Sequence, residues 1–419
     1  MNETVMEPGR EVPVDERCDV LVAGGGIAGV AAALAAARQG IRVVLIERVF
    51  GLGGLATLGN VIMYLPLCDG YGRQIMGGIA EELIHRSVAE LKAPVPAARF
   101  LPVPECWKPG GDPSQRSDKR LLTGFNPYAF QMEMEQVLED AGVTIMYDTR
   151  VCQVTRQGGG LTHVIVENKS GRLAVQAEQF IDATGDADVC HLAGVAVEHF
   201  EHNVLASWYY EIHNGELKLM QFSNRYDKEH RDGNRAVGPF YSGTDHRSVT
   251  RHVLDSRRLL RDKLAEKRAK HPADAIYPFG LPSIPDLRIT RRVHNRFSLG
   301  ERHRHVWLED CVGMTGDWRR RGPVYPIPLR SIQADGCPNL FVAGRCISAD
   351  QTVIDVVRAI GTCAVSGEAC GAAAAMLVRE RIADGEVPLE RLQKALIKGG
   401  VLIDPALIEP ASAEAAAVT

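Results

Sequence analysis

The segment of residues 18–48 constrains the fold of this chain more than any other part of the sequence. An apolar run at residues 20–22 leads into a glycine-rich turn, an alanine-rich stretch without proline, and a second apolar run at residues 41–46. A strand, a glycine turn, a helix and a second strand in this order form the βαβ unit that binds dinucleotides. The free N–H groups at the start of the helix favour a phosphate there.

Each glycine of the turn has its own role in such a unit. Gly24 permits the tight turn, Gly26 lets the backbone approach a pyrophosphate, and Gly29 allows the helix to pack closely on the strand. Glu47 ends the second strand, 23 residues beyond Gly24, where its carboxylate can accept hydrogen bonds from a ribose. The segment therefore predicts a dinucleotide site at the edge of a parallel sheet.

Length and charge restrict the remaining possibilities. A chain of 419 residues is long for one core, and we expect two or three structural units. The formal charge of −4 shows no basic excess, which argues against nucleic acid or an anionic membrane as a partner. Residues 1–16 have the pattern of neither a secretory signal nor a transit peptide, and no apolar run is long enough to span a bilayer.

The cysteine and histidine spacings do not predict a metal site. Ten cysteines are scattered without a Cys-x-x-Cys pair, and we interpret most of them as small buried residues in a reducing cytoplasm. His303 and His305 are two residues apart, but no neighbouring cysteine or carboxylate set completes a ligand shell. We expect a cytoplasmic protein without a bound metal.

Two later segments repeat the pattern of an apolar strand that ends in glycine, at residues 179–185 and 339–344. Ligands of open parallel sheets lie beyond the carboxyl ends of the strands, so all three strand ends can meet one cofactor. NAD alone would need only the first of them, whereas the longer FAD takes contacts from distant parts of the chain. The distribution favours FAD, and the sequence holds no second complete fingerprint for NAD(P)H.

With these motifs the sequence resembles the FAD-dependent oxidoreductase family, which is related to the glutathione-reductase-like flavoproteins and to the succinate dehydrogenase and fumarate reductase type. The likeness covers most of the chain, and its further motifs lie at residues 51–59, 77–78, 181–188, 289–292, 317–325 and 343–367. The resemblance implies that FAD is bound without a covalent link, because residues 49–52 lack the histidine of covalently flavinylated relatives. It also implies the positions that hold FAD, namely Gly24, Gly26, Ala28, Gly29, Glu47, Arg48, Gly53, Gly54, Thr57, Val151, Ala183, Thr184, Gly185, Gly344, Arg345, Arg358 and Thr362.

The order of elements and the resemblance together predict an α/β fold. We expect a Rossmann-like FAD-binding domain, with three layers, a parallel sheet and a β-meander, over residues 17–197 and 326–385. An α+β substrate lobe is inserted at residues 198–325, and a C-terminal helix and tail follow over residues 386–419. Within these parts, residues 251–270 predict a charged surface helix, and residues 352–379 predict one long helix of small residues.

The flavin itself would carry the hydride, so the protein has to supply a substrate clamp and a proton-transfer group. Arg291 and Arg292 could bind a carboxylate or carbonyl, and a structural ion pair explains them equally well. Tyr325 lies in a proline-framed strand and could donate a proton, although a core aromatic is the more frequent use of such a position. These three are the predicted catalytic residues.

The main prediction is an FAD-dependent oxidoreductase that transfers a hydride between a small organic substrate and FAD. Dehydrogenase, reductase and oxidase all remain open, with a separate electron acceptor or donor, and a homo-oligomer is compatible with each. One alternative is a flavin-dependent monooxygenase that uses NAD(P)H and O2. Another is a non-catalytic flavin-binding redox sensor or complex subunit.

Overall fold

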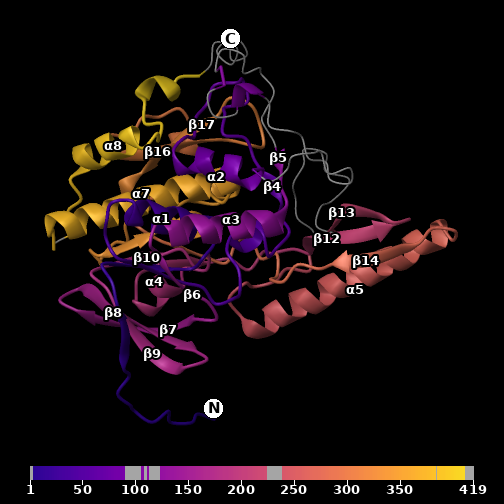
Figure 1. The fold of residues 1–419 in the computed structure, drawn as a ribbon, viewed down its shortest axis with the longest axis horizontal. Helices are drawn as coiled ribbons and strands as arrows, with labels where there is room; N and C mark the ends of the chain where they lie inside the picture. The colour runs from indigo at the N-terminus through magenta and orange to yellow at the C-terminus, as the bar shows by residue number, and fades with distance from the viewer. Residues whose placement is uncertain are drawn as a thin grey trace.

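The structure is a computed structural model that describes residues 3–89, 105–107, 111–112, 123–223, 238–383 and 385–410. Its centre is a five-stranded parallel sheet in the order β18-β10-β2-β3-β6 (Figure 1). The strands are β2 (Val20–Ala23), β3 (Val43–Ile46), β6 (Thr144–Met146), β10 (Gln179–Asp182) and β18 (Leu340–Val342). Because all five run in one direction, their carboxyl ends meet at one edge. The predicted α/β fold is confirmed.

Helices α1 (Ile27–Ala37), α3 (Pro127–Asp140) and α7 (Ile360–Glu380) cover one face of this sheet. Helices α2 (Ile79–Ser87) and α8 (Leu389–Lys398) pack against α7. Helices α1 and α7 lie in very close contact, since a Cβ on Gly367 would come within 2.1 Å of the Ala28 carbonyl oxygen and one on Gly371 equally close to that of Ala32. Helix α7 is long and apolar enough to cross a membrane, but it is almost entirely buried in the fold, as a core helix is.

A second sheet covers the other face, in the order β1-β9-β8-β7. It consists of β1 (Val14–Arg17), β7 (Arg150–Gln157), β8 (Gly160–Asn168) and β9 (Gly171–Gln176). Val164 and Val175 of this meander pack with Leu21 and Val44 of the central sheet, which completes the three layers. Strand β1, which no sequence pattern indicated, pairs in parallel with β9.

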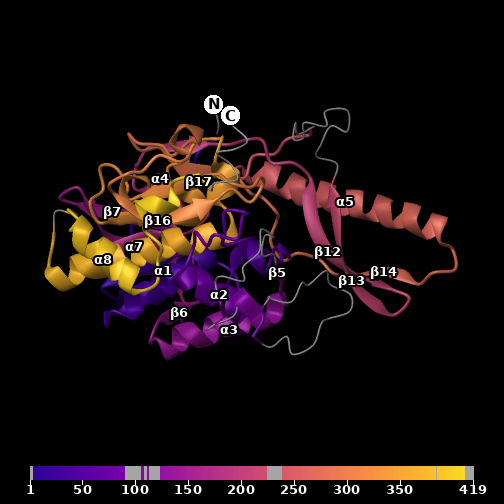
Figure 2. The same ribbon diagram turned by 90° about the horizontal axis from the view of Figure 1, so that it is seen from above.

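The inserted lobe projects from the three-layer body, as Figure 2 shows from above. Its sheet has the order β13-β12-β14, with β12 (Ala206–His213), β13 (Glu216–Ser223) and β14 (Ile276–Gly280), and α5 (His246–Lys270) packs on it through Leu260 and Leu264. The helix begins five residues before the predicted start because Asp245 caps it, accepting a hydrogen bond from the Ser248 amide at 2.7 Å.

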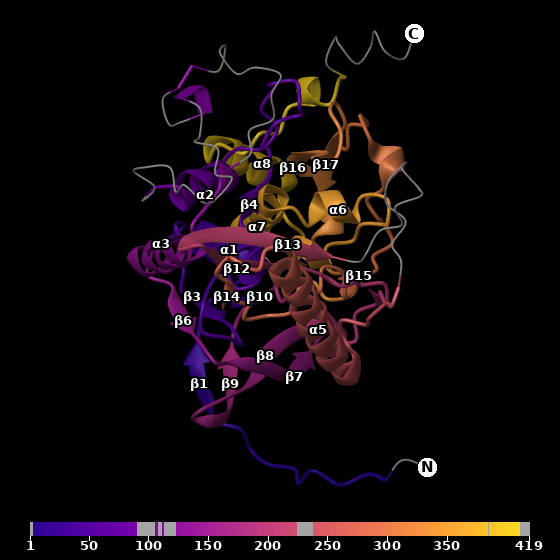
Figure 3. The ribbon, with the colours of Figure 1, turned by 90° about the vertical axis from the view of Figure 1, so that its right-hand side faces the viewer.

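Short elements lead into the lobe and back from it. The chain enters through α4 (Asp188–Leu192) and β11 (Val197–His199), and it returns through β15 (Arg291–Val293), β16 (Cys311–Gly316), β17 (Val324–Pro328) and α6 (Ile354–Val357). Elsewhere, β4 (Met63–Tyr64) and β5 (Thr123–Gly124) form a small ribbon. Strands β16 and β17 pair as a hairpin near α7 and α6 (Figure 3). The domain boundaries given above stay predictions, and residues 411–419 of the expected tail lie outside the described residues.

The single helix predicted over residues 352–379 was wrong. The structure has two helices, α6 and α7, separated by Arg358 and Ala359. Ala359 is extended, with φ −64° and ψ 149°, so the helical hydrogen-bond ladder stops and a new helix starts at Ile360. The break gives α7 an N-terminus next to the strand ends.

Candidate functional site

The carboxyl ends of the central strands open into a cavity of about 700 Å³, within the size range of cofactor sites. Strands β2, β3, β10 and β18 contribute to its wall, together with β7 and the starts of α1 and α7. Fourteen of the seventeen positions predicted for FAD line it, which are Gly24, Gly26, Ala28, Glu47, Arg48, Gly53, Gly54, Val151, Ala183, Thr184, Gly185, Gly344, Arg345 and Arg358. Gly29, Thr57 and Thr362 are not among the lining residues. The structure thus brings together most of a set that spans more than 300 residues.

The glycine turn after β2 has the geometry that its sequence predicted. Gly24 has φ +104°, and a Cβ there would lie 2.4 Å from the Ala183 carbonyl oxygen. A Cβ on Gly29 would lie 1.8 Å from the Gly24 oxygen, so α1 can approach the turn only with glycine there. A Cβ on Gly26 would have no other part of the protein within 4 Å. The turn is therefore packed from behind and open towards the cavity.

Glu47 closes one side of the turn. Its Oε2 accepts a hydrogen bond from the Gly25 amide at 2.6 Å, and its Oε1 accepts one from the Val49 amide at 3.1 Å. Burial raises the pKa of this carboxyl, and the two amides oppose that shift. Each carboxylate oxygen can accept a second hydrogen bond, so Glu47 keeps acceptor capacity towards the cavity that it lines.

A second glycine loop lies against the first. Gly53 and Gly54 both have positive φ, and the Gly53 amide donates to the Gly25 carbonyl at 2.8 Å. Thr57 stands behind this loop, 4% exposed, and its hydroxyl donates to the Leu52 carbonyl. Thr57 therefore holds the loop in shape, while Gly53 and Gly54 present backbone to the cavity.

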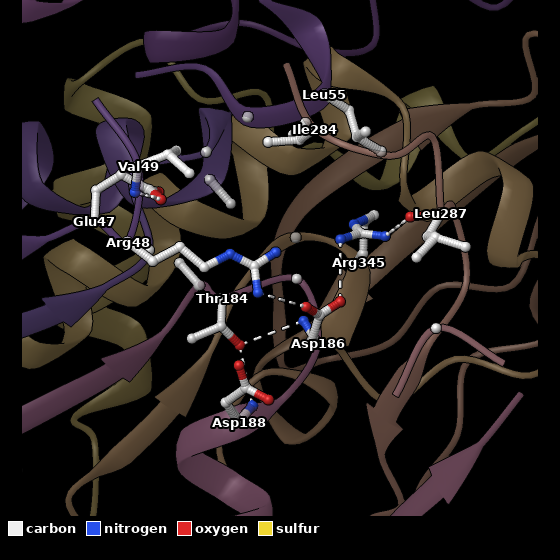
Figure 4. A pocket seen from close by; sticks show the side chains of 18 of the residues that line it. Glu47, Arg48, Val49, Leu55, Thr184, Asp186, Asp188, Ile284, Leu287 and Arg345 are labelled. Atoms are coloured by element: carbon white, nitrogen blue, oxygen red, sulfur yellow. Dashed lines mark hydrogen bonds and ion pairs between the residues drawn. The ribbon is translucent and has the colours of Figure 1, made fainter. Parts of the chain in front are cut away.

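Ionic contacts join the strand ends across the cavity (Figure 4). The carboxylate of Asp186, after β10, lies 3.4 Å from Arg48, after β3, and 3.4 Å from Arg345, after β18. Arg345 also donates to the Leu287 carbonyl at 2.5 Å, which ties the return from the lobe to this wall. Leu55 and Ile284 lie side by side and form an apolar part of the lining (Figure 4).

The break between α6 and α7 places another guanidinium in the lining. Arg358 donates through Nε to Asp355 at 2.8 Å. Burial lowers the pKa of this guanidinium, and the charge of Asp355 opposes that shift. Thr362, in the first turn of α7, is fully buried, and its hydroxyl lies 2.8 Å from that of Thr315. Arg358 therefore places a positive charge at the start of α7. Thr362 is buried behind this lining and fixes the first turn of α7 through its contact with Thr315.

Of the three predicted catalytic residues, Arg291 lines the cavity. Its Nε donates to the Asp186 carbonyl at 2.8 Å, and its Nη2 forms an ion pair with Asp188. Burial raises the pKa of Asp188 to about 6, and the carboxylates of Asp186 and Asp182 add to this shift. Arg291 is thus held by two contacts at the edge of the cavity.

Arg292 and Tyr325 are not lining residues. Arg292 is 5% exposed, donates through Nε to Glu198 at 3.1 Å and stacks its guanidinium 5.0 Å above the Phe200 ring. Tyr325 is fully buried, donates to Glu301 at 2.5 Å and accepts from Arg320 at 3.2 Å. The structure does not bring these two together with Arg291, and their catalytic role stays a prediction.

Several lining residues were missed by the sequence reasoning. They are Asp186, Asp188, His191, Thr244, His246, Thr250, Ile284, Leu287 and Cys363. Asp186 and Asp188 lie in the strand-end motif that carried the resemblance, so proximity to Gly185 was an available signal. The residues from the start of α5 carry no local pattern, because only the tertiary arrangement of the lobe brings them to the cavity.

The residues present suit FAD. The start of α1 has no side-chain cap among the described residues, so its first amides are available to an anion next to the open position of Gly26. Glu47 keeps acceptor capacity for a ribose, and the cavity continues from there to Arg345 and Arg358. No group of three or more His, Cys, Asp or Glu that could hold a metal ion occurs within the described ranges.

Comparison with known proteins identifies the family. A family model described as FAD dependent oxidoreductase matches residues 19–204 and 302–396. No curated protein matches the chain. A geranylgeranyl bacteriochlorophyll reductase-like protein from Thermoplasma acidophilum is 14% identical, with 91% of this chain and 83% of that chain covered and a TM-score of 0.47. The p-nitrophenol 4-monooxygenase PnpA from Pseudomonas putida is 11% identical, with 96% and 92% covered and a TM-score of 0.45.

These two structural similarities are too low to bear on the reaction. The family match covers about two thirds of the chain, including the glycine turn after β2, the second glycine loop at Gly53 and Gly54, and the start of α7. The chain belongs to the FAD-dependent oxidoreductase family, and FAD is its cofactor.

Proposed function

We propose that this oxidoreductase transfers a hydride between a small organic substrate and FAD that is held in the cavity without a covalent bond. The observation that supports the proposal is the continuous lining from Glu47 at the end of β3 to Arg345 and Arg358 beside α7. A lining assembled from four strand ends suits a long cofactor that stays bound better than a short nucleotide. Bound FAD supplies the hydride chemistry.

The chain's own residues bind the cofactor and orient it in the cavity. The first amides of α1 take the diphosphate, and Gly26 leaves room for it. The Glu47 carboxylate accepts hydrogen bonds from the ribose hydroxyls. Leu55, Ile284 and Leu287 exclude water from their part of the cavity. The guanidinium of Arg358 and the N-terminus of α7 favour negative charge at the end of the cavity that they share.

Arg291 is the predicted catalytic residue that we propose as a substrate contact, because it lines the cavity. Its two hydrogen bonds to the Asp186 carbonyl and to Asp188 fix the guanidinium, so a substrate carboxylate or carbonyl would meet an oriented donor. The catalytic role of Arg292 and Tyr325 stays a prediction, because neither residue lines the cavity. A separate electron donor or acceptor completes the reaction, since the sequence holds one dinucleotide fingerprint.

We also propose a cytoplasmic location, which is supported by the ten cysteines. Most of them are buried, as small apolar residues in a reducing compartment are, and the sequence has no Cys-x-x-Cys pair. Expression with a reporter that fluoresces only in that compartment tests this proposal, and accumulation elsewhere would contradict it.

The absorption spectrum of the purified protein tests the cofactor. Flavin bands that acid precipitation releases into the supernatant support non-covalent FAD, and a spectrum without flavin after FAD has been added contradicts it. Anaerobic titration with candidate metabolites then tests the reaction. Bleaching by a metabolite but not by NAD(P)H supports the proposal. Rapid bleaching by NAD(P)H followed by substrate hydroxylation in O2 would favour a monooxygenase instead.

A further inference from the structure

Helix α5 concentrates positive charge in a protein that is acidic as a whole. Nine of its 25 residues are Lys or Arg and three are Asp or Glu, whereas the chain has a formal net charge of −4. Helix α5 runs along the lobe that projects from the body (Figure 2). An ordinary solvated helix mixes both signs along its surface.

Five arginines of α5 form one line along its outer face, which we call the arginine stripe. They are Arg247, Arg251, Arg258, Arg261 and Arg268, spaced four, seven, three and seven residues apart, and all five are exposed. These spacings keep side chains on one face of a helix, and at 1.5 Å per residue the stripe is about 32 Å long. The opposite face carries Leu260 and Leu264, which are buried against the lobe's sheet. The stripe therefore points away from the protein, apart from Arg268, whose Nε donates to the Ile276 carbonyl of β14 at 2.7 Å.

Only part of this charge is neutralised inside the chain. Asp255 forms ion pairs with Arg251 at 2.8 Å and with Arg258 at 2.6 Å. Arg247 and Arg261 take part in no ion pair within the described part of the chain. Leu254, half exposed, lies on the same face between Arg251 and Arg258. An apolar residue among arginines is the composition of an interface centre more than of a solvated surface.

We propose that the arginine stripe is a docking surface for an acidic protein. Guanidinium groups bind carboxylates through two parallel hydrogen bonds, which a row of lysines would not do. The stripe is long enough to meet a helix or a strand edge that carries several carboxylates. The partner's surface should carry carboxylates opposite the arginines and an apolar contact opposite Leu254.

Other anionic partners match the surface less well. A membrane-binding helix needs an apolar face for the lipid, and the apolar face of α5 is already used within the lobe. A long nucleic acid would run on from the lobe to the rest of the chain, which is acidic and repels it. A compact acidic protein can contact the lobe alone.

The stripe starts beside the cofactor cavity. His246, Val249 and Thr250, in the first turns of α5, line that cavity. A protein seated on the stripe therefore lies close to the site where the proposed function calls for a separate electron donor or acceptor. The docking does not depend on that function, and only the nature of the partner as an electron carrier would rest on it.

Binding of labelled poly-L-glutamate to the full-length holoprotein, followed by fluorescence anisotropy, tests the proposal. We expect binding that weakens with salt, and a loss of about tenfold or more in affinity in the variant Arg247→Glu/Arg261→Glu. The matched control Lys263→Glu/Lys270→Glu makes the same charge change on exposed positions of α5 away from the stripe. Its affinity should stay within about twofold of the wild type.

Equal binding by the wild type and the stripe variant would overturn the proposal, as would tighter binding of a duplex DNA oligomer or of phosphatidylserine vesicles than of poly-L-glutamate. Thermal unfolding and FAD absorbance of the same samples show whether the variants are folded. A holoprotein that no metabolite reduces but that binds poly-L-glutamate through the stripe would contradict the proposed function and leave the docking surface standing.

Discussion

Arg345 and Asp186 face each other at the cavity wall, with 3.4 Å between the guanidinium Nη2 and the carboxylate Oδ1, although 159 residues separate them in the sequence (Figure 4). The other carboxylate oxygen lies 3.4 Å from Arg48. One acidic side chain thus connects the ends of β3, β10 and β18. These are the strand ends that give the cavity its charged wall.

The pair should contribute more to stability than an exposed surface pair, even a shorter one. In a double-mutant cycle with Asp186→Asn and Arg345→Gln, we expect a coupling free energy of about 1 kcal/mol in urea unfolding, because both side chains are largely shielded from water. Glu380 and Arg391 lie 2.7 Å apart, but the Arg391 side chain is 60% exposed. A double-mutant cycle for Glu380 and Arg391 should give a smaller coupling free energy, since solvent screens an exposed pair. Equal coupling in both cycles would contradict this reasoning.

Replacing two glycines of the first turn by alanine should have different effects. Gly29→Ala should lower the free energy of unfolding by about 1–3 kcal/mol, because its Cβ would overlap the Gly24 carbonyl oxygen. Gly26→Ala places its Cβ in open space, so the melting temperature of the apoprotein should not change. Its affinity for FAD, measured by fluorescence quenching, should fall about tenfold or more because the methyl group stands where the diphosphate would approach. A Gly26→Ala variant that binds FAD normally would show that the diphosphate lies elsewhere.

Glu368 should make stability depend on pH. It is 6% exposed on α7 and accepts a hydrogen bond from the Ile79 amide at 2.7 Å, and burial raises its pKa to about 7. The folded state therefore holds a proton that the unfolded chain releases near pH 4.5, so this contribution to stability is fully present below pH 4.5 and is lost as the pH rises to about 7. Glu368→Gln keeps an acceptor for the Ile79 amide without the charge.

The variant should be more stable than the wild type above pH 7, by up to about 3 kcal/mol, and the difference should shrink towards pH 4.5. Urea unfolding across this range measures it. Glu390→Gln, which removes an exposed carboxylate from α8, should differ from the wild type by less than about 0.5 kcal/mol. A Glu368→Gln difference that stays constant with pH would mean that Glu368 does not titrate in this window.

Arg358 should tune the reduction potential of bound FAD. Arg358→Gln removes a positive charge from the cavity next to the start of α7, where it would favour the negative charge of the reduced cofactor. We expect the midpoint potential to fall by about 30 mV, which equals about 1.4 kcal/mol for two electrons. Arg379→Gln removes an equal charge from the exposed far end of the same helix and should leave the potential unchanged. If the Arg358→Gln and Arg379→Gln variants have equal midpoint potentials, the charge of Arg358 does not act on the flavin.

Local sequence patterns predicted the elements that depend on local chemistry. The glycine turn and α1 followed from the spacing of Gly24, Gly26 and Gly29, and the meander followed from alternating residues around short turns. Residues 352–379 were predicted as one helix because small apolar residues there have no breaker. The extended backbone of Ala359, which separates α6 from α7, has no local signal in the sequence.

The sequence by itself determined that the chain binds a dinucleotide on a parallel sheet, because three strands that end in glycine present their carboxyl ends to one ligand whatever surrounds them. It also supplied most of the residues that line the cavity. The tertiary structure decided which charges meet there. Asp186 joins Arg48 and Arg345, Arg291 reaches the lining while Arg292 and Tyr325 do not, and α5 turns its arginines outward. These relationships depend on contacts between residues far apart in the chain, and no local pattern encodes them.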